Sequence, residues 1–488
     1  MKRAYIQITG SDVDLVDAFN SAIGQAMDDK NNLPGSWTIV LPPFLYKQAP
    51  RLEGVQYEKA AQVIASRYGG LLHGNLIVRN QPKHLWASVI YDVLVQKYRL
   101  GSGGGLRIAS NSEAMTARNK DVSLLFYSVF NPCDGYGSSA ERLAVHTARI
   151  DLGFSWRHLG MNEDSIKMSS KETLRLASSS KRQNPNCADN YLFYYTPNVI
   201  SNEVQMAPAK KSGKPVGLMS MFETTKLPTR WPKLINDHFD YVVVPSQFCK
   251  DIFEQNGIVK PITVVPLGVD PDLWPVLVRE RTAKQPYRFL LYSNTRWDCP
   301  RKNADITLEA FRKAFAGNPK VELIIKTSFG GDLPPLWNNE KVIDGRLIQS
   351  ELLDLLQSVD CLVFASSGEG FGLPPREAMC TGLPVIVSNW SALSDICIKG
   401  ISYWVEPRGL KPASIPGWLE QENNNSTFFG EFAKISPTDI AEKMNYVYTH
   451  QEEASTIGSN AATWIRENNT YELAAQTLLS VHRSLVQG

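Results

Sequence analysis

Two glutamates, Glu369 and Glu377, stand eight positions apart on either side of a glycine-rich segment. The apolar run before them and the prolines after the glycines predict a buried strand, a loop and then a helix, because proline suits a first helical turn. Gly370 and Gly372 would let the backbone approach a ligand closely. We therefore expect Glu369 in the loop and Glu377 in the first turn of the helix.

This segment has the features of a site that binds an anion at the start of the helix and hydroxyl groups at the two glutamates. The free amides at the start of a helix and the positive end of its dipole favour phosphate. Carboxylates accept strong hydrogen bonds from hydroxyl groups, and a Rossmann-type site uses one on ribose. The chemistry indicated is the binding of a molecule that carries hydroxyl groups on either side of a phosphate.

Two cations, Arg296 and Lys302, follow the apolar run 287–293 and come just before a predicted helix. Cations in this place can neutralise a leaving diphosphate as charge develops on it. The alternative is that they are solvated surface charges, which is the ordinary environment of these residue types.

Further residues stand in loops that follow apolar runs. Glu223 lies in the turn 222–228, where it could serve a site or cap a helix. Gly135 and Gly137 lie in the loop 131–139, and short glycine motifs of this kind are often only tight turns. Both interpretations stay open for these three residues.

The elements that would position these residues fall into three stretches and predict an α/β fold. Strand-like runs alternate with helical patterns in about 1–118, and the glycines at 101–105 predict its end. The stretches 119–270 and 271–470 hold apolar strands separated by helices, as a parallel sheet buried on both faces requires. A last helix over 471–488 is expected to pack back on the 119–270 domain.

The expected strands are short and apolar, at 4–9, 37–41, 76–78, 122–129, 191–195, 216–221, 241–244, 262–265, 287–293, 321–326, 361–364 and 385–387. Helices are expected over 11–29, 55–67, 84–98 and 438–486.

Composition excludes some classes of protein. No apolar run approaches the roughly 18 residues that a membrane-spanning helix needs. The seven cysteines are odd in number and never form a C-x-x-C pair, which favours free thiols in a reducing compartment. A formal net charge of +2 argues neither for nor against an anionic partner. We expect a cytoplasmic protein, with peripheral contact with a membrane left open.

The glutamate pair and its surroundings resemble a known family. Glu369 and Glu377, with Gly-Phe-Gly-Leu-Pro between them, look like the E-x7-E signature of retaining, family-4-type glycosyltransferases of the GT-B fold. The segment 292–303 resembles the first C-domain strand of that family with its diphosphate-binding Arg/Lys pair. The resemblance covers about 120–410 and implies two Rossmann-like domains facing across a cleft. It does not explain 1–118, which we expect to form an N-terminal α/β extension without an assigned role.

The resemblance implies roles for individual residues. Glu369, Arg296, Lys302 and Glu223 would be the catalytic set. The donor would lie against Gly370, Phe371, Gly372, Leu373 and Glu377 on one side and Gly135 and Gly137 on the other. Many relatives carry a histidine in the N-domain, and Glu223 stands in the best-placed loop here instead.

The implied reaction transfers a sugar from a nucleoside-diphosphate sugar, UDP- or GDP-linked, with retention and with no metal ion or other cofactor. We expect front-face attack, in which the leaving phosphate helps to deprotonate the acceptor and Glu369 orients the sugar. A double displacement would need a carboxylate on the opposite face of the anomeric carbon, and the sequence does not place one.

Other functions remain as alternatives. The acceptor could be a glycan, a lipid-linked precursor or a small molecule, and the same chemistry on a nucleic acid or protein stays open. A phosphorylase or sugar-nucleotide epimerase shares the architecture, and a non-catalytic sugar-nucleotide scaffold is the alternative from another class. The nucleotide, the sugar and the oligomeric state are not determined by the sequence.

Overall fold

The computed structural model describes residues 3–7, 36–40, 75–78, 122–131, 135–151, 154–159, 188–200, 209–279, 285–293, 301–327, 334–414, 423, 426 and 428–487. These residues fall into two compact units. One unit contains a three-stranded parallel sheet in the order β1-β2-β3, with β1 Arg3–Gln7, β2 Ser36–Val40 and β3 Asn75–Val78. The helices expected over 11–29, 55–67 and 84–98 lie outside the described residues.

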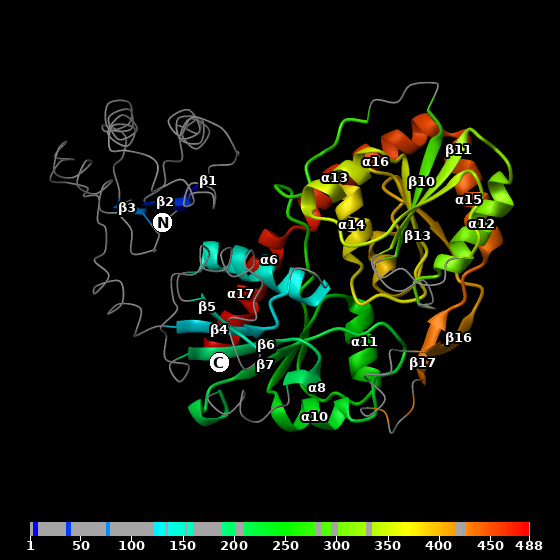
Figure 1. The fold of residues 1–488 in the computed structure, drawn as a ribbon. Coiled ribbons are helices and arrows are strands. Elements are labelled where there is room, and N and C mark those ends of the chain that lie inside the picture. The colour runs from blue at the N-terminus through cyan, green and yellow to red at the C-terminus, as the bar shows by residue number, and fades with distance from the viewer. Residues whose placement is uncertain are drawn as a thin grey trace, which may run out of the picture. The chain divides into compact units, whose positions relative to one another are not determined.

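The second unit contains two Rossmann-like domains, each built on a six-stranded sheet (Figure 1). The first Rossmann-like domain along the chain is called the N-terminal domain below, and the second the C-terminal domain. The sheet of the N-terminal domain has the order β5-β4-β6-β7-β8-β9, and its pairs from β6 to β9 are parallel. Its strands are β4 Val122–Ser128, β5 Phe154–His158, β6 Ala188–Tyr194, β7 Val216–Met219, β8 Tyr241–Val244 and β9 Ile262–Val264. Its helices are α6 Gly135–Ile150, α8 Pro197–Ile200, α10 Trp231–His238 and α11 Gln247–Gln255.

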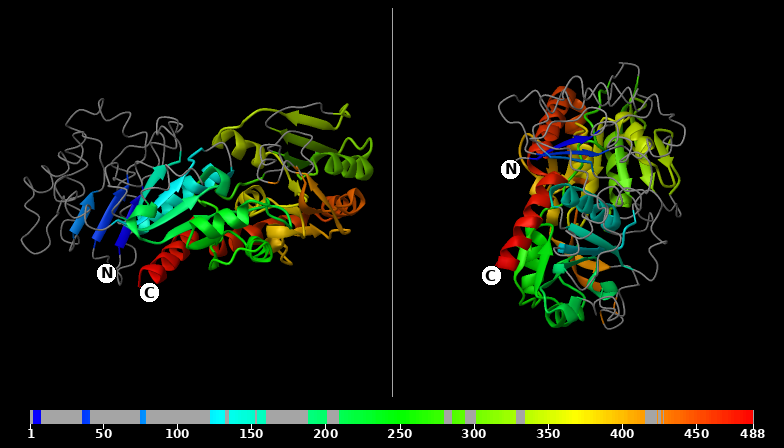
Figure 2. Two further views of the ribbon diagram at one scale, coloured as in Figure 1. Left: turned by 90° about the horizontal axis from the view of Figure 1, so that it is seen from below. Right: turned by 90° about the vertical axis from the view of Figure 1, so that its left-hand side faces the viewer.

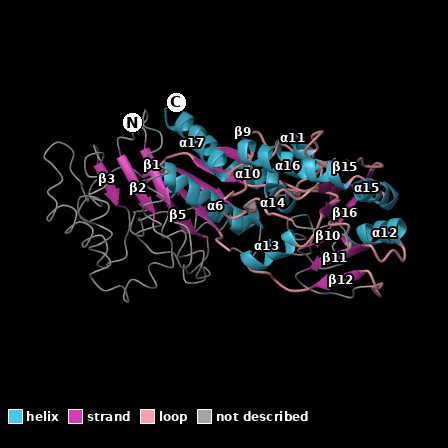
Figure 3. Ribbon diagram, turned by 90° about the horizontal axis from the view of Figure 1, so that it is seen from above, coloured by secondary structure: helices cyan, strands magenta, loops and turns pink. Residues whose placement is uncertain are grey.

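The C-terminal sheet is parallel throughout and has the order β12-β11-β10-β13-β14-β15. Its strands are β10 Tyr287–Ser293, β11 Val321–Thr327, β12 Glu340–Ile343, β13 Cys361–Phe364, β14 Val385–Ser388 and β15 Tyr403–Val405. Helices α12 Ala304–Phe315, α13 Gln349–Gln357, α14 Leu373–Cys380, η4 Ser391–Ile396, α15 Pro437–Thr449 and α16 Gln451–Asn468 belong to this domain, and Figure 3 shows helices and strands in separate colours.

The central strands of the C-terminal sheet are buried on both faces. Phe289 and Val363 pack in one apolar cluster with α12 and α15, and Leu290 and Leu362 pack in another with α14. The order of the strands reverses between β10 and β13, so the loops that follow these two strands leave the same edge of the sheet in opposite directions. Ligands of open α/β sheets bind at such a point.

A hairpin and a last helix complete the two Rossmann-like domains. A two-stranded antiparallel hairpin, β16 Leu410–Ser414 and β17 Phe428–Ala433, follows β15. After α16 the chain leaves the C-terminal domain, and the last helix, α17 Tyr471–Gln487, packs against α6 of the N-terminal domain (Figure 2). No helix among the described residues is long and apolar enough to cross a membrane.

Candidate functional site

The loop after β13 and the start of α14 form the centre of the candidate site. Gly372 precedes α14 with φ 82°, a left-handed conformation that suits glycine, and Pro374 and Pro375 occupy the first turn as predicted. Glu377 is the fifth residue of α14 and therefore lies in the second turn, one turn later than expected. The helix begins at Leu373, one residue before the prolines, so Glu377 falls in its second turn.

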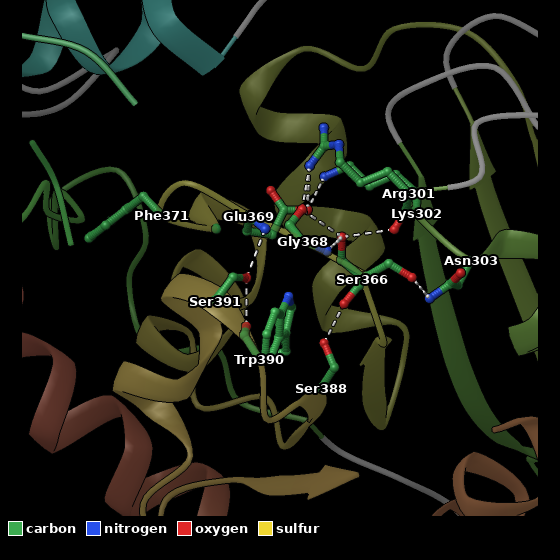
Figure 4. A network of polar contacts seen from close by, with 12 residues as sticks. Arg301, Lys302, Asn303, Ser366, Gly368, Glu369, Phe371, Ser388, Trp390 and Ser391 are labelled. Carbon is green, nitrogen blue, oxygen red and sulfur yellow. Dashed lines mark hydrogen bonds and ion pairs between the residues drawn. The ribbon is translucent and has the colours of Figure 1, made fainter. Parts of the chain in front are cut away.

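Glu369 is buried and held by two cations (Figure 4). The Lys302 Nζ lies 2.5 Å from Oε1 of Glu369, and Nη1 of Arg301 lies 2.9 Å from the same oxygen. Burial acts to raise the pKa of Glu369, but Arg301 and Lys302 outweigh it and lower the pKa to about 2. Glu369 is therefore a carboxylate at any physiological pH.

The two cations are positioned by the residue that follows them. Asn303 takes the left-handed conformation, with φ 51°, and is completely buried before α12. Its Nδ2 donates to the carbonyl of Ala365 at 2.7 Å and to the Ser367 hydroxyl at 2.8 Å. These bonds fix the start of α12 beside the loop that follows β13. The Lys302 ammonium then lies over the ring of Phe364, 4.7 Å from its centroid.

Further contacts hold the Glu369 loop from behind. Ser391 accepts the amide hydrogen of Glu369 at 2.9 Å, and the Ala392 amide donates to the Glu369 carbonyl at 3.2 Å. The buried Arg376 guanidinium donates to the carbonyls of Phe371, Gly372 and Ala392, and it stacks on the Phe371 ring. The glycine-rich loop is therefore fixed by the hydrogen bonds that Arg376 donates to its backbone carbonyls.

Glu377 lies in a different environment from Glu369. It lines a small cavity with the rings of Tyr292 and Trp274, with Pro374, and with leucines 352, 356 and 362. Burial in these surroundings raises the pKa of Glu377 to about 7. An acidic side chain of this kind can accept or donate a hydrogen bond close to neutral pH.

The N-terminal domain brings Glu223 to the Glu369 loop. A Cβ on Gly368 would collide with the carbonyl oxygen of Glu223, and one on Gly370 would lie 2.8 Å from the Met221 side chain. Ser246, which precedes α11, donates to the Gly370 carbonyl at 2.9 Å. Burial raises the pKa of the half-buried Glu223, while Arg301 lowers it and Glu369 raises it further.

The remaining predicted residues have separate outcomes. Gly135 and Gly137 lie in the first turn of α6 rather than in a loop, so the loop expected over 131–139 is wrong from Gly135 onwards. Gly137 has no room for a side chain, because a Cβ would meet the backbone of Asn131. Phe371 lies in the loop before α14, where Arg376 stacks on its ring, and Leu373 is the first residue of α14. Arg296 lies outside the described residues.

Sequence reasoning missed Arg301, Asn303, Ser391 and Arg376. Arg301 adjoins Lys302, and its charge was a usable signal. Asn303 comes directly before a helix, where asparagine is a favoured residue. Ser391 carried no signal, because its contact with Glu369 joins loops that are 22 positions apart.

Residues 287–414, which run from β10 to β16, match the family described as glycosyl transferases group 1. A relative in Sulfolobus islandicus filamentous virus, whose name assigns it to the glycosyltransferases, is 27% identical over 238 residues, 48% of this chain and 63% of the relative. An MMP α-(1→4)-mannosyltransferase of Mycolicibacterium hassiacum is 27% identical over 169 residues, 32% of this chain and 38% of the relative. The chain thus spans less than two thirds of either relative.

A solved structure agrees on the fold. The crystal structure of HepE from Anabaena in complex with UDP aligns with a TM-score of 0.53 at 14% identity, over 74% of this chain and 100% of that one. This confirms the predicted fold of two Rossmann-like α/β domains of the GT-B type.

Proposed function

We propose that this chain is a retaining glycosyltransferase that transfers a sugar from a nucleoside-diphosphate sugar to an acceptor. The observation that carries the proposal is the meeting of Glu369, Lys302 and Arg301 beside the amino end of α14. This places an ionised carboxylate and the Lys302 ammonium beside the positive end of the α14 dipole, where the strand order reverses. Such a set suits a sugar joined to a diphosphate. The group 1 match over 287–414 contains all of these residues.

The residues divide the donor among them in this proposal. The amino end of α14 and the cations of Lys302 and Arg296 bind the diphosphate and stabilise the charge that develops as it leaves. Glu369 orients the sugar through its hydroxyl groups, and Glu377 accepts hydrogen bonds from ribose. Glu223 faces this group from the N-terminal domain and is the candidate for contact with the acceptor.

The finer parts of the proposal concern stereochemistry, cofactor and acceptor. The E-x7-E resemblance supports retention with no metal ion required, and we propose front-face attack as the route to retention. A glycan or lipid-linked acceptor in the cytoplasm is the leading hypothesis. Transfer to a nucleic acid or protein would use the same donor chemistry. Incubation with each class of acceptor and detection of the attached sugar distinguishes these alternatives.

The proposal is tested by release of nucleoside diphosphate from a panel of UDP- and GDP-sugars by the purified chain, with water or an added panel of glycan acceptors taking up the sugar. We expect release with one donor and a loss of about 100-fold in rate in Lys302→Met, as for removal of one preorganised stabilising contact. Lys341→Met is the matched control, because Lys341 pairs with Glu322 on the surface. Equal rates in the two variants, or no release with any donor, would contradict the assigned site.

A further inference from the structure

Arg301 makes more contacts with the Glu369 loop than the proposed reaction explains. Its Nη1 donates to the Gly368 carbonyl at 2.9 Å and lies 2.9 Å from Oε1 of Glu369. The Arg301 carbonyl in turn accepts the amide of Ser367 at 2.7 Å and the hydroxyl of Ser366 at 3.1 Å. Backbone and side chain of one residue therefore bind four consecutive residues of the loop, 366–369. Figure 4 shows three of them, Ser366, Gly368 and Glu369, around Arg301.

Lys302 cannot provide the same hold. A lysine ammonium is a single point charge on a flexible stem, whereas guanidinium donors keep a fixed plane. Lys302 is also one of the cations that would bind the diphosphate, so its bond to Glu369 competes with the donor. The donor does not compete in this way for the hydrogen bond from Arg301 to the Gly368 carbonyl, because that carbonyl is part of the backbone and stays in place when the diphosphate binds.

We infer that Arg301 is a positioning residue, which fixes the carboxylate and the preceding peptide of Glu369 against the donor sugar and does not bind the diphosphate. Both cations reach the same oxygen, Oε1, so the carboxylate of Glu369 is held from one side by Arg301 and Lys302 together. This inference rests on the proposed function and adds a residue to it.

Arg301 also lies beside the contact between the two Rossmann-like domains. The Glu223 backbone contacts Gly368, whose carbonyl Arg301 holds, so the guanidinium fixes the peptide against which the N-terminal domain packs. Arg301 is also the cation that most lowers the pKa of Glu223. One guanidinium therefore acts on carboxylates from both domains.

The test compares Arg301→Gln and Arg301→Lys with the wild-type chain in donor turnover and in donor binding. We expect kcat to fall about 10- to 100-fold in Arg301→Gln, as for loss of hydrogen bonds to a charged group, with the donor Kd changed by less than about twofold. Arg301→Lys keeps the charge and should recover part of kcat.

A pH profile separates positioning from simple loss of stability. Arg301 helps to keep the pKa of Glu369 at about 2, so its removal raises that pKa and moves the acid limb of kcat to higher pH. Arg408→Gln is the matched control, because Arg408 makes two 2.7 Å bonds to Asp439 on the surface. The control should change neither kcat nor the acid limb.

Three results would overturn the inference. Unchanged kcat in Arg301→Gln, with an active wild type, removes the positioning role alone. Donor binding that weakens in parallel with kcat makes Arg301 a phosphate ligand. A wild type that releases no nucleotide from any donor contradicts the proposed function itself, and the positioning role with it. Near-ultraviolet circular dichroism confirms that each variant is folded.

Discussion

Glu369 and Glu377 belong to one loop and helix, yet their pKa values move in opposite directions. Burial raises both, but at Glu369 the charges of Arg301 and Lys302 outweigh it and bring the pKa down to about 2. Burial acts alone on Glu377 and brings its pKa up to about 7. The first carboxylate is thus a fixed charge, while the second changes its charge near neutral pH.

The raised pKa of Glu377 predicts a pH dependence of donor binding. An ionised carboxylate accepts hydrogen bonds from ribose hydroxyls more strongly than a protonated one, so the affinity for a nucleotide sugar should increase about tenfold between pH 6 and 8. Titration calorimetry with the intact nucleotide sugar avoids the ionisation of a terminal phosphate. Glu377→Gln should bind weakly and without this slope, and a flat profile in the wild type would contradict the assignment of Glu377.

The sequence predicted the residues of this site where charge and glycine stand in one short segment. Glu369 and Glu377 belong to such a segment, whereas Lys302 was predicted from its place between an apolar run and a helix. Arg376 and Ser391 were not predicted, because their bonds depend on a fold that brings the loop after β14 under the loop after β13. Hydrogen bonds between loops that are distant in sequence have no pattern along the chain.

At the scale of elements, the start of α12 decides where the cations lie. Asn303→Ala removes two hydrogen bonds to the loop after β13 and leaves a left-handed backbone that alanine tolerates poorly. We expect a loss of about 2 kcal/mol in stability and weaker donor binding. Thermal unfolding measures the first effect, and Asn303→Gly should recover the backbone part. An Asn303→Ala chain as stable as the wild type would show that this junction is not required.

The predicted elements differ from the observed ones where apolar patterning was weak. Strands 287–293 and 361–364 were predicted with their observed bounds, since buried parallel strands are almost purely apolar. The hairpin β16–β17 was missed, because β16 has exposed and half-buried residues and contains Pro412. β12 and β15 were missed as well, and both are edge strands of their sheet.

At the scale of the whole molecule, the chain crosses between the two Rossmann-like domains twice, and the crossings touch. Val269 forms a bridge with Thr470, and a Cβ on Gly268 would collide with the backbone there. Beside this crossing Asp270 is buried and lies 3.2 Å from the ring of His146 on α6. The sequence gave no sign of this pair, because its members are 124 positions apart.

The Asp270 pair predicts how stability depends on pH. Burial acts to raise the pKa of Asp270, but His146 and Arg142 outweigh it and lower the pKa. A depressed carboxylate pKa adds stability above the unfolded value of about 3.9, and this contribution is lost as the pH falls through the folded value. Asp270→Asn should therefore cost about 3 kcal/mol at pH 7 and flatten the acid decline of the thermal midpoint. A variant with the same midpoint at neutral pH would exclude this role.

The most direct test of the donor site is thermal unfolding of the purified chain with UDP, GDP and a panel of their sugars. At about 100 times the dissociation constant, a specific donor should add about 2.7 kcal/mol of stability. We expect a raised midpoint with one nucleotide family and its loss in Glu377→Ala. A folded chain whose midpoint no nucleotide or nucleotide sugar changes would exclude the assigned donor site and favour a scaffold that binds no donor.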